Sequence, residues 1–270
     1  MNATHWIQSG GVTLAAEVAG TGAPIVFLHA AVADRRMWRP QLNGLSVNNR
    51  TIAYDRRGFG ETLTERQEDF SPVADLMAVI DALANETPAI LVGCSQGGRI
   101  ALDAALRHPS RVRALILIAP GVSGAPEAVY PPEIKDLMAR LADAEHVGDL
   151  DQINAMKARV WLDGPLADAG RIIGGARKLF LEMNAIALRS PPTGANLDVA
   201  PAFDRLGEIS VPSLVICGDL DFPHIQDRCR HIATVLNGTH HVLVGAAHLP
   251  SLERPTDLTD LLMTFINRLL

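Results

Sequence analysis

Short runs of apolar residues alternate along this chain with longer stretches in which apolar residues recur every three or four positions. The short runs, rich in Val, Ile and Leu, predict strands at Val12–Val18, Ile25–His29, Thr51–Tyr54, Ala89–Gly93, Ala114–Ala119, Ser213–Gly218 and His241–Val244. Several of these runs are almost continuously apolar, which is typical of strands that are covered on both faces.

Helical patterns separate the predicted strands. They cover residues 71–86, 96–110, 224–236 and 256–270, and the first of them opens with Ser71 and Pro72, an N-cap followed by a proline suited to the first helical position. Strands and helices in alternation predict an α/β fold, with a mostly parallel, twisted central sheet and helices on both of its faces.

The alternation stops between about Pro120 and Pro201. This region holds prolines at positions 126, 131, 132, 165, 191 and 192, helical patterns such as "PEIKDLMARLADA", and no strand pattern. We therefore interpret residues 121–200 as a helical insertion. Residues 1–120 and 201–270 then form one core domain, which agrees with a length of 270 residues.

Composition and charge narrow the class of protein. Hydrophobic residues make up 48% of the chain and charged residues 20%, so the chain can bury a sizeable core. The net charge is −6 and the Lys and Arg residues are scattered, which argues against a nucleic-acid partner. The N-terminal residues "MNATHWIQSGGVTL" lack the basic segment and apolar stretch typical of a signal peptide, and the longest apolar run, "ALILIA", is too short to span a bilayer. We therefore expect a cytoplasmic protein without a membrane partner.

Cysteine usage gives no sign of a disulfide framework or of a metal site. Cys94, Cys217 and Cys229 are an odd number and lack the C-x-x-C spacing of zinc ligands. We expect three reduced, buried thiols, with no metal and no cofactor.

The stretch "VGCSQGGR" carries the clearest chemistry. Gly93-Cys94-Ser95-Gln96-Gly97 matches G-x-S-x-G, and it lies between a predicted strand and a predicted helix. A tight turn there lifts Ser95 above the sheet edge as a nucleophile, and the small neighbours relieve crowding around a strained backbone. Cys94 competes for the role, but nothing beside it lowers the pKa of a thiol, and a packing role is the commoner one.

A serine nucleophile needs a base, and the base needs an acid to orient it. His248 lies in the loop after the last predicted strand, where its side chain reaches the carboxyl edge of the sheet. Asp219 and Asp221 both follow the strand Ser213–Gly218, and the residues alone leave open which of them faces the histidine. Backbone N–H groups of Gln96 and Ala31 are candidates for an oxyanion hole.

Five ordered stretches spread over nearly the whole chain resemble the motifs of the α/β-hydrolase fold superfamily. "VFLHAAVADRRMW" is similar to its His-Gly oxyanion loop, "YDRRGFGET" to its D-x-R-G-x-G-x-S turn, and "VGCSQGG" to its nucleophile elbow. "CGDLDFP" and "GAAHLPSLERP" resemble its G-x-x-D-x-x-x-P and G-x-x-H stretches. The chain departs from these motifs at Ala30 for Gly, at Thr62 for Ser, and at Pro223, which follows Asp221 by two residues instead of four.

The resemblance implies a role for individual residues. Ser95 is then the nucleophile, His248 the base and Asp221, in preference to Asp219, the acid. The backbone N–H groups of Ala31 and Gln96 form the oxyanion hole. Because haloalkane dehalogenases and epoxide hydrolases have Asp at the elbow, Ser95 argues against both, whereas esterases, enol-lactonases, C–C bond hydrolases and perhydrolases keep Ser.

The helical insertion becomes a lid over the active site in this interpretation. Apolar residues that could line an acyl pocket, or form the core of the lid and its neighbourhood, are Met37, Trp38, Trp161, Leu162, Phe180 and Met183. For the arginines near the motifs we expect solvated or structural roles; they are Arg35, Arg36, Arg56, Arg57 and Arg99.

The sequence therefore predicts a serine hydrolase of the esterase or lactonase type, with a small ester or lactone as its partner and an acyl-enzyme intermediate. A C–C bond hydrolase, or another cofactor-free lyase or perhydrolase on the same scaffold, is the alternative. A non-catalytic ligand-binding protein is the second alternative. A homo-oligomer is possible.

Overall fold

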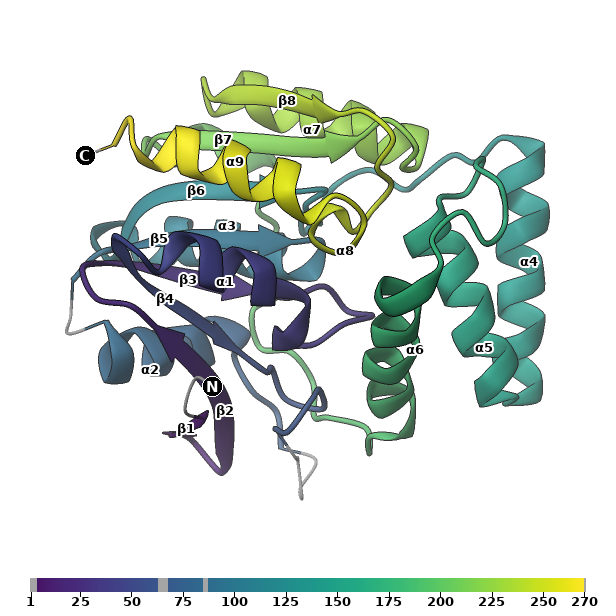
Figure 1. Cartoon of the computed structure of the whole chain (residues 1–270), viewed down its shortest axis with the longest axis horizontal. Coiled ribbons are helices and arrows are strands. Elements are labelled where there is room, and N and C mark those ends of the chain that lie inside the picture. Colours follow the sequence, from purple (N-terminus) through teal and green to yellow (C-terminus); the bar gives the residue numbers. More distant parts are fainter. Residues whose placement is uncertain (1–3, 63–67, 85–86, 270) are drawn as a thin grey trace.

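A computed structural model describes residues 4–62, 68–84 and 87–269, which form a central sheet flanked by helices (Figure 1). Within these residues the sheet has eight strands in the order β1-β2-β4-β3-β5-β6-β7-β8. The strands are β1 Thr4–Ser9, β2 Val12–Ala19, β3 Ala23–Leu28, β4 Asn49–Tyr54, β5 Ala89–Cys94, β6 Val112–Ile118, β7 Ser213–Gly218 and β8 Thr239–Leu243.

Strands β4, β3, β5, β6, β7 and β8 run parallel, whereas β1 and β2 pair antiparallel at one edge. The predicted fold class, a mostly parallel sheet with helices on both faces, is confirmed. All seven predicted strands are present. Strand β1 was not predicted, because Ile7 and Ser9 are its buried residues and it has no apolar run to reveal it.

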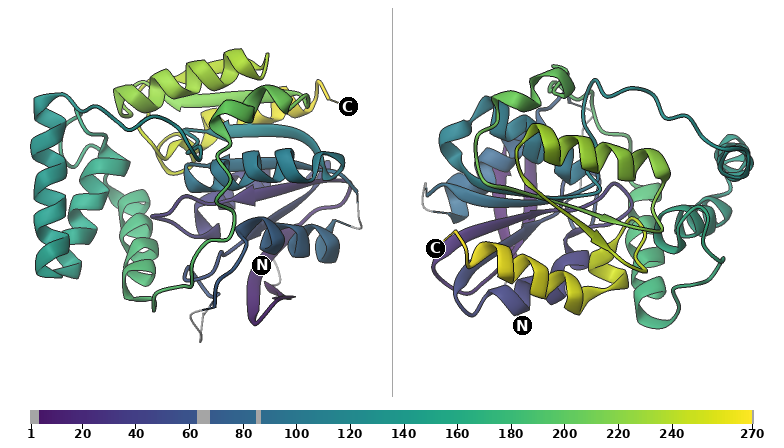
Figure 2. Two further views of the ribbon diagram at one scale, coloured as in Figure 1. Left: turned by 180° about the vertical axis from the view of Figure 1, so that it is seen from behind. Right: turned by 90° about the horizontal axis from the view of Figure 1, so that it is seen from above.

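Helices cover the two faces of the sheet (Figure 2). The helices α2 (Pro72–Leu83), α3 (Gln96–Arg107) and α7 (Pro223–Val235) pack on one face. The other face carries α1 (Arg39–Leu45) and α9 (Pro255–Ile266), which is preceded by the short helix α8 (Pro250–Glu253). Each face has its own hydrophobic cluster, and β3, β5 and β6 contribute alternate residues to both.

The predicted helices agree with these bounds within a few residues. Ser71 caps α2 as expected, and its hydroxyl accepts a hydrogen bond from Ala74 N. The last two positions of the predicted helix 71–86, and residue 270 at the end of the predicted helix 256–270, lie outside the described residues.

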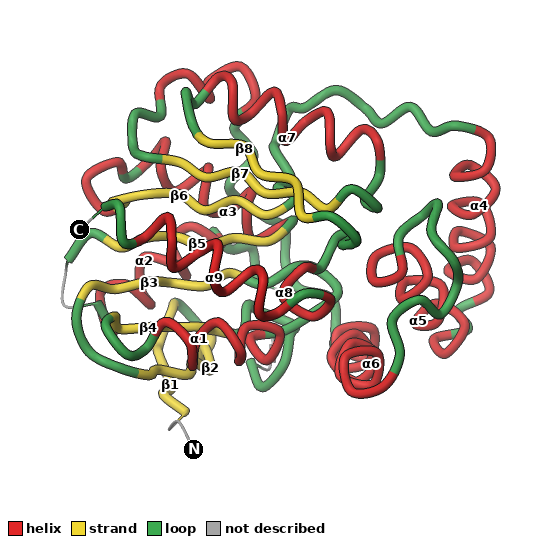
Figure 3. The backbone as a smooth tube through the Cα atoms, turned by 45° about the horizontal axis from the view of Figure 1, so that its top comes forward, coloured by secondary structure: helices red, strands yellow, loops and turns green. Residues whose placement is uncertain are grey.

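Three further helices form a separate group beyond the carboxyl ends of the parallel strands (Figure 3). They are α4 (Pro132–Val147), α5 (Leu150–Lys157) and α6 (Gly174–Arg189), with a π-helical turn, Ala158–Asp163, following α5. We call residues 121–200 the helical segment; all of them are described, and none lies in a strand. Its position places helical residues directly above the edge of the sheet where the candidate catalytic groups lie.

Candidate active site

Ser95 lies at the sharp turn between β5 and α3. Its backbone has φ 54° and ψ −114°, a left-handed conformation that is uncommon for any residue other than glycine. Backbone hydrogen bonds hold the turn: Ser95 N donates to Ile118 O at 2.9 Å, and Ser95 O accepts from Gly121 N at 2.9 Å and from Arg99 N at 3.1 Å. The side chain is half-buried, so the strained turn presents the hydroxyl at the edge of the sheet.

The glycines around Ser95 are required by close backbone contacts. A Cβ atom at Gly93 would lie 2.5 Å from Gly97 O, and one at Gly97 would lie 2.2 Å from Leu28 O. Neither residue has a positive φ. The glycines of the motif therefore permit the helix to start against the strands, while the strained conformation falls on the serine itself.

His248 and Asp221 form a buried pair at the same edge. His248 Nδ1 lies 2.8 Å from Asp221 Oδ2, and the second carboxylate oxygen accepts a hydrogen bond from Phe222 N at 2.8 Å. Because Nδ1 faces the carboxylate, it carries the proton, and Nε2 is left as the basic nitrogen. The Cys94 thiol donates to His248 O at 3.5 Å, which places the histidine loop against the residue that precedes Ser95.

Asp219 is turned away from the histidine. Its carboxylate accepts a hydrogen bond from Gly245 N at 2.6 Å and so fixes the turn that follows β8. The structure thus brings Asp221, and not Asp219, to His248, although the two carboxylates follow the same strand.

The candidate oxyanion donors lie on either side of the elbow. Gln96 is the first residue of α3, and the N–H of a first helical residue has no acceptor within its own helix. Ala31 lies exposed in the turn after β3. The preceding residue, Ala30, is fully buried and has no positive φ, so this departure from glycine is accommodated without strain.

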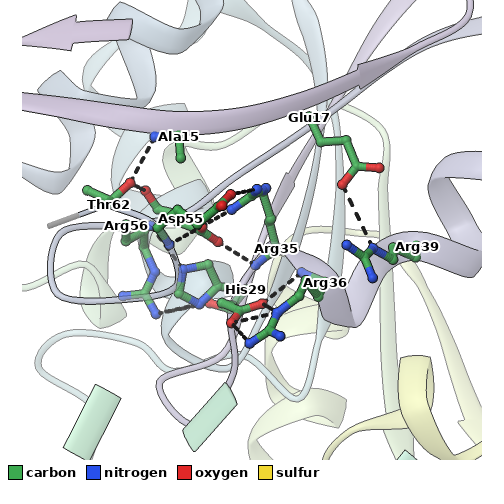
Figure 4. Close-up of polar contacts among 11 residues, drawn as sticks. Ala15, Glu17, His29, Arg35, Arg36, Arg39, Asp55, Arg56 and Thr62 are labelled. Atoms are coloured by element: carbon green, nitrogen blue, oxygen red, sulfur yellow. Dashed lines mark hydrogen bonds and ion pairs between the residues drawn. The ribbon is translucent and has the colours of Figure 1, made fainter. Parts of the chain in front are cut away.

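The His29 side chain ties the Ala31 turn to the loop after β4 (Figure 4). Its Nε2 accepts a hydrogen bond from Arg56 N at 3.0 Å, so Nδ1 carries the proton and donates to Ala30 O at 2.8 Å. Burial, together with the nearby Arg56 charge, lowers the pKa of His29 well below its usual value. The ring is therefore neutral at neutral pH and acts as a fixed link.

Asp55 makes a second link between the same loops. It accepts hydrogen bonds from Arg35 N at 2.8 Å and Glu61 N at 2.9 Å, and it pairs with the Arg35 guanidinium. Burial raises the pKa of Asp55 to about 6, and Arg35 opposes the shift. Thr62 replaces the usual serine without loss, since its hydroxyl donates to Asp55 O at 2.8 Å.

The histidine loop is held by a buried carboxylate that the sequence analysis missed. Glu253 accepts hydrogen bonds from the backbone N–H groups on both sides of His248, from Ala247 at 2.6 Å and from Leu249 at 2.8 Å. It also pairs with Arg171, a residue of the helical segment. Arg171 donates in addition to Gly245 O at 3.0 Å and to Leu162 O at 3.0 Å, so one guanidinium joins the histidine loop to the helical segment.

The six apolar residues proposed for a pocket lie at the junction between the helical segment and the core. The Trp161 ring packs on His248, with ring centroids 4.6 Å apart. The other five are fully buried in the hydrophobic cluster that also contains Ala30, Val32 and Leu249; they are Met37, Trp38, Leu162, Phe180 and Met183. Trp161 is thus placed against a candidate catalytic group, and the remaining residues hold the helical segment to the sheet.

The three cysteines are free and buried, and burial raises the pKa of Cys94 far above its usual value. A protonated, enclosed thiol is a poor nucleophile. In the described part of the chain, no group of His, Cys, Asp and Glu side chains has the arrangement of a metal site, and no helix is long and apolar enough to cross a membrane.

Comparison with known proteins identifies the family. The sequence model of the alpha/beta hydrolase family matches residues 25–261, and the chain therefore belongs to that family. The chain is 29% identical over 237 residues to a putative 2-succinyl-6-hydroxy-2,4-cyclohexadiene-1-carboxylate synthase of Bacillus subtilis, covering 82% of each protein. It is 25% identical to 3-oxoadipate enol-lactonase 1 of Acinetobacter baylyi, covering 95% of this chain and 94% of the relative.

A further relative matches less than half of the chain. It is 38% identical over 120 residues to 2-hydroxymuconate semialdehyde hydrolase of a Pseudomonas species, covering 42% of this chain and 41% of the relative. Among solved structures, bromoperoxidase from Bacillus anthracis is similar with a TM-score of 0.78 at 19% identity, covering 98% of this chain and all of the other. That likeness concerns the fold alone.

Proposed function

We propose that this chain is a serine hydrolase that cleaves a small carboxylic ester or lactone. The observation that carries the proposal is the strained Ser95 turn at the same sheet edge as the buried His248–Asp221 pair. A serine, an oriented imidazole and a carboxylate are the groups that acyl transfer requires. Among its relatives, one that aligns over nearly the whole chain is named as an enol-lactonase.

In the proposed mechanism Ser95 Oγ attacks the carbonyl carbon while His248 Nε2 takes the hydroxyl proton. The N–H groups of Ala31 and Gln96 bind the oxyanion, and each such donor contributes a factor of about 10² to 10³ to the rate. The alcohol leaves with the proton held by His248. Water, deprotonated by His248, then attacks the acyl-enzyme, and the acid is released as Ser95 regains its proton. Asp221 orients the imidazole and stabilises its charged form.

We also propose that residues 121–200 act as a lid, with Trp161 as the wall of the acyl pocket nearest the chemistry. The ring contact between Trp161 and His248 supports this role, because an acyl group on Ser95 must fit beside that ring. The five buried residues around it then shape the pocket indirectly, by fixing the helical segment.

Replacement of Ser95 by Ala tests the proposal. With 4-nitrophenyl acetate we expect kcat/KM to fall by about 10⁴-fold or more, because the nucleophile is lost and binding groups alone remain. Cys94→Ala is the matched control and should keep its activity. A fluorophosphonate probe should label Ser95 in the wild-type protein; a ligand-binding protein without catalysis would not react. Retained turnover in Ser95→Ala would refute the mechanism.

A C–C bond hydrolase is the second candidate, favoured by the local match to 2-hydroxymuconate semialdehyde hydrolase. The same three residues would then act on a ketone. A panel of aryl esters, enol-lactones and vinylogous diketones separates the two functions. We expect the highest kcat/KM on an ester or lactone, and a preference for the diketone would replace the first candidate by the second.

A further inference from the structure

Arg56 is a buried cation that has no carboxylate partner among the described residues. Its residue is 7% exposed, and the ion pairs of the described chain do not include it. The neighbouring arginines differ in this respect: Arg35 pairs with Asp55, and Arg57 pairs with Asp75 at 2.8 Å. Asp55 favours the charged form of Arg56 from a distance, but a buried charge without an ion pair is costly to the folded state, so its presence points to an anion that arrives later.

The hydrogen-bond donors of Arg56 are largely unused by the protein. Because His29 Nδ1 carries a proton for Ala30 O, the 3.2 Å contact between Arg56 Nη2 and His29 Nδ1 joins two donors and is not a hydrogen bond. His29 O, at 3.2 Å from Nη2, is its acceptor. The buried Nε has no partner among the described residues. A guanidinium carries five N–H donors, and no described residue accepts from Nη1, so the Nη1–Nη2 end of the fork remains for a ligand.

A cavity of about 140 Å³ lies against this guanidinium. Its lining includes Arg56, Gln96 and Asn196, together with the Phe59 ring, whose centroid is 4.6 Å from Arg56 Cζ. A water molecule takes about 30 Å³ of liquid volume, so the cavity has room for a group of several non-hydrogen atoms.

The other charged groups of the lining compensate each other. Asp75 accepts hydrogen bonds from Arg57 and from Ser9 Oγ at 2.6 Å. Among the charged residues that line the cavity, Arg56 is therefore the one without an ion pair in the described chain. Burial lowers the pKa of Arg56 to about 10, which leaves it charged at neutral pH.

The cavity adjoins the candidate active site through Gln96. This residue lines the cavity and directly follows Ser95, and its N–H is a proposed oxyanion donor. Figure 4 shows that Arg56 lies against His29, and His29 Nδ1 in turn donates to Ala30 O, next to Ala31. A substrate whose carbonyl lies at Ser95 can thus extend one arm toward Arg56.

We infer that the substrate carries a carboxylate, and that Arg56 binds it in this cavity. The inference rests on the proposed hydrolase function and narrows its substrate to a monoester of a dicarboxylic acid, or a lactone with a free carboxylate. Guanidinium groups bind carboxylates through two parallel N–H···O bonds, and the Nη1–Nη2 end of the Arg56 guanidinium offers such a pair.

A pair of matched esters tests the inference. We compare 4-nitrophenyl butyrate, which is neutral, with mono-4-nitrophenyl glutarate, which has a terminal carboxylate. We expect the wild-type protein to prefer the anionic ester in kcat/KM, and Arg56→Met to reduce the ratio of the two values by about 10- to 100-fold. Arg56→Lys should give an intermediate ratio. Arg205→Gln, which removes a half-exposed arginine paired with Glu208, is the control and should leave the ratio unchanged.

A binding measurement separates failure of this inference from failure of the proposed function. In Ser95→Ala, glutarate should raise the melting temperature with increasing concentration, glutaramide should not, and Arg56→Met should abolish the effect of glutarate. Glutarate binding without hydrolysis of either ester would keep the carboxylate site and refute the hydrolase proposal. Hydrolysis of both esters at equal rates without glutarate binding would overturn the inference and keep the hydrolase. If Arg56→Met does not fold, Arg56→Lys serves as the test variant. An unchanged ratio of the kcat/KM values for the anionic and the neutral ester in Arg56→Lys would then overturn the inference.

Discussion

Replacement of Glu253 by Gln perturbs the residue that holds the histidine loop in place. The carboxylate accepts one hydrogen bond from Ala247 N and one from Leu249 N, and it neutralises Arg171. A glutamine keeps one acceptor oxygen and turns the other position into an NH₂ group. That group would face a backbone N–H, donor against donor, on one side of His248.

The expected cost follows from these contacts. Loss of a hydrogen bond to a charged acceptor costs about 1.5–3 kcal/mol. Breaking a buried ion pair costs about 3–5 kcal/mol, but Arg171 is 20% exposed and keeps carbonyl acceptors at Gly245 and Leu162, so we take about 1 kcal/mol for this part. The sum, about 3 kcal/mol, corresponds to a decrease of about 6–12 °C in melting temperature.

Urea denaturation and steady-state kinetics measure the two consequences of Glu253→Gln. We expect the free energy of unfolding to fall by about 3 kcal/mol and kcat for 4-nitrophenyl acetate to fall by about tenfold or more, because small displacements of a catalytic group are costly. Arg171→Met and the double variant complete a cycle, whose coupling energy should be about 0.5–3 kcal/mol. Asp257→Asn, at an exposed pair with Arg254, is the control. A Glu253→Gln protein with unchanged stability and unchanged kcat would refute the reasoning.

Three further predictions concern the two aspartates that follow β7, the Cys94 thiol and the Asp103 carboxylate. Asp221→Asn should lower kcat by about 10⁴-fold, since the imidazole loses the acceptor that fixes its tautomer, whereas Asp219→Asn should lower it by less than about tenfold. Cys94 should resist iodoacetamide in the native protein, as mass spectrometry can show, because burial raises its pKa. Burial also raises the pKa of Asp103 to about 6, above the unfolded value, so its contribution to stability is lost as pH rises from about 4 to 6. The free energy of unfolding of Asp103→Asn, measured by denaturation, should therefore rise relative to that of the wild type between pH 4.5 and pH 7.

Each of these predictions has a contrary result. Equal effects of the two aspartate substitutions would remove the distinction between Asp219 and Asp221. Rapid alkylation of Cys94 would show that its enclosure is incomplete. A stability difference between wild type and Asp103→Asn that does not change with pH would mean that Asp103 titrates normally in the folded protein.

The sequence predicts the sheet well because most strands are buried on both faces and are therefore almost continuously apolar. Strand β1 escapes prediction because it lies at the edge, pairs with β2 alone and exposes Trp6. The helix α1 is short and contains Gly44, so its periodicity is too brief to recognise. The local sequence pattern thus predicts the buried strands, whereas the edge strand β1 and the short helix α1 depend on contacts with residues distant in the sequence.

The candidate site also contains residues that the sequence predicts and residues that only the fold reveals. Ser95 and His248 can be placed from their positions relative to strands. The choice between Asp219 and Asp221 follows from the motif resemblance and not from the pattern of residues, since the N–H that occupies Asp219 comes from a residue after the next strand. Arg171 and Glu253 are 82 positions apart, and no local signal connects them. That Arg56 has no ion pair with a described residue is likewise visible only once the partners of its neighbours are known.

The Arg171–Glu253 pair also bears on how this protein could be re-engineered. If the helical segment is the lid proposed above, exchanging it for that of a relative, with the core left intact, is a direct way to alter the substrate range. A grafted segment without an arginine at the position of Arg171 would leave Glu253 without its cation and the loop of His248 without one of its supports, even if the chain junctions themselves were well formed. Only a helical segment that carries this arginine is therefore suitable for such an exchange.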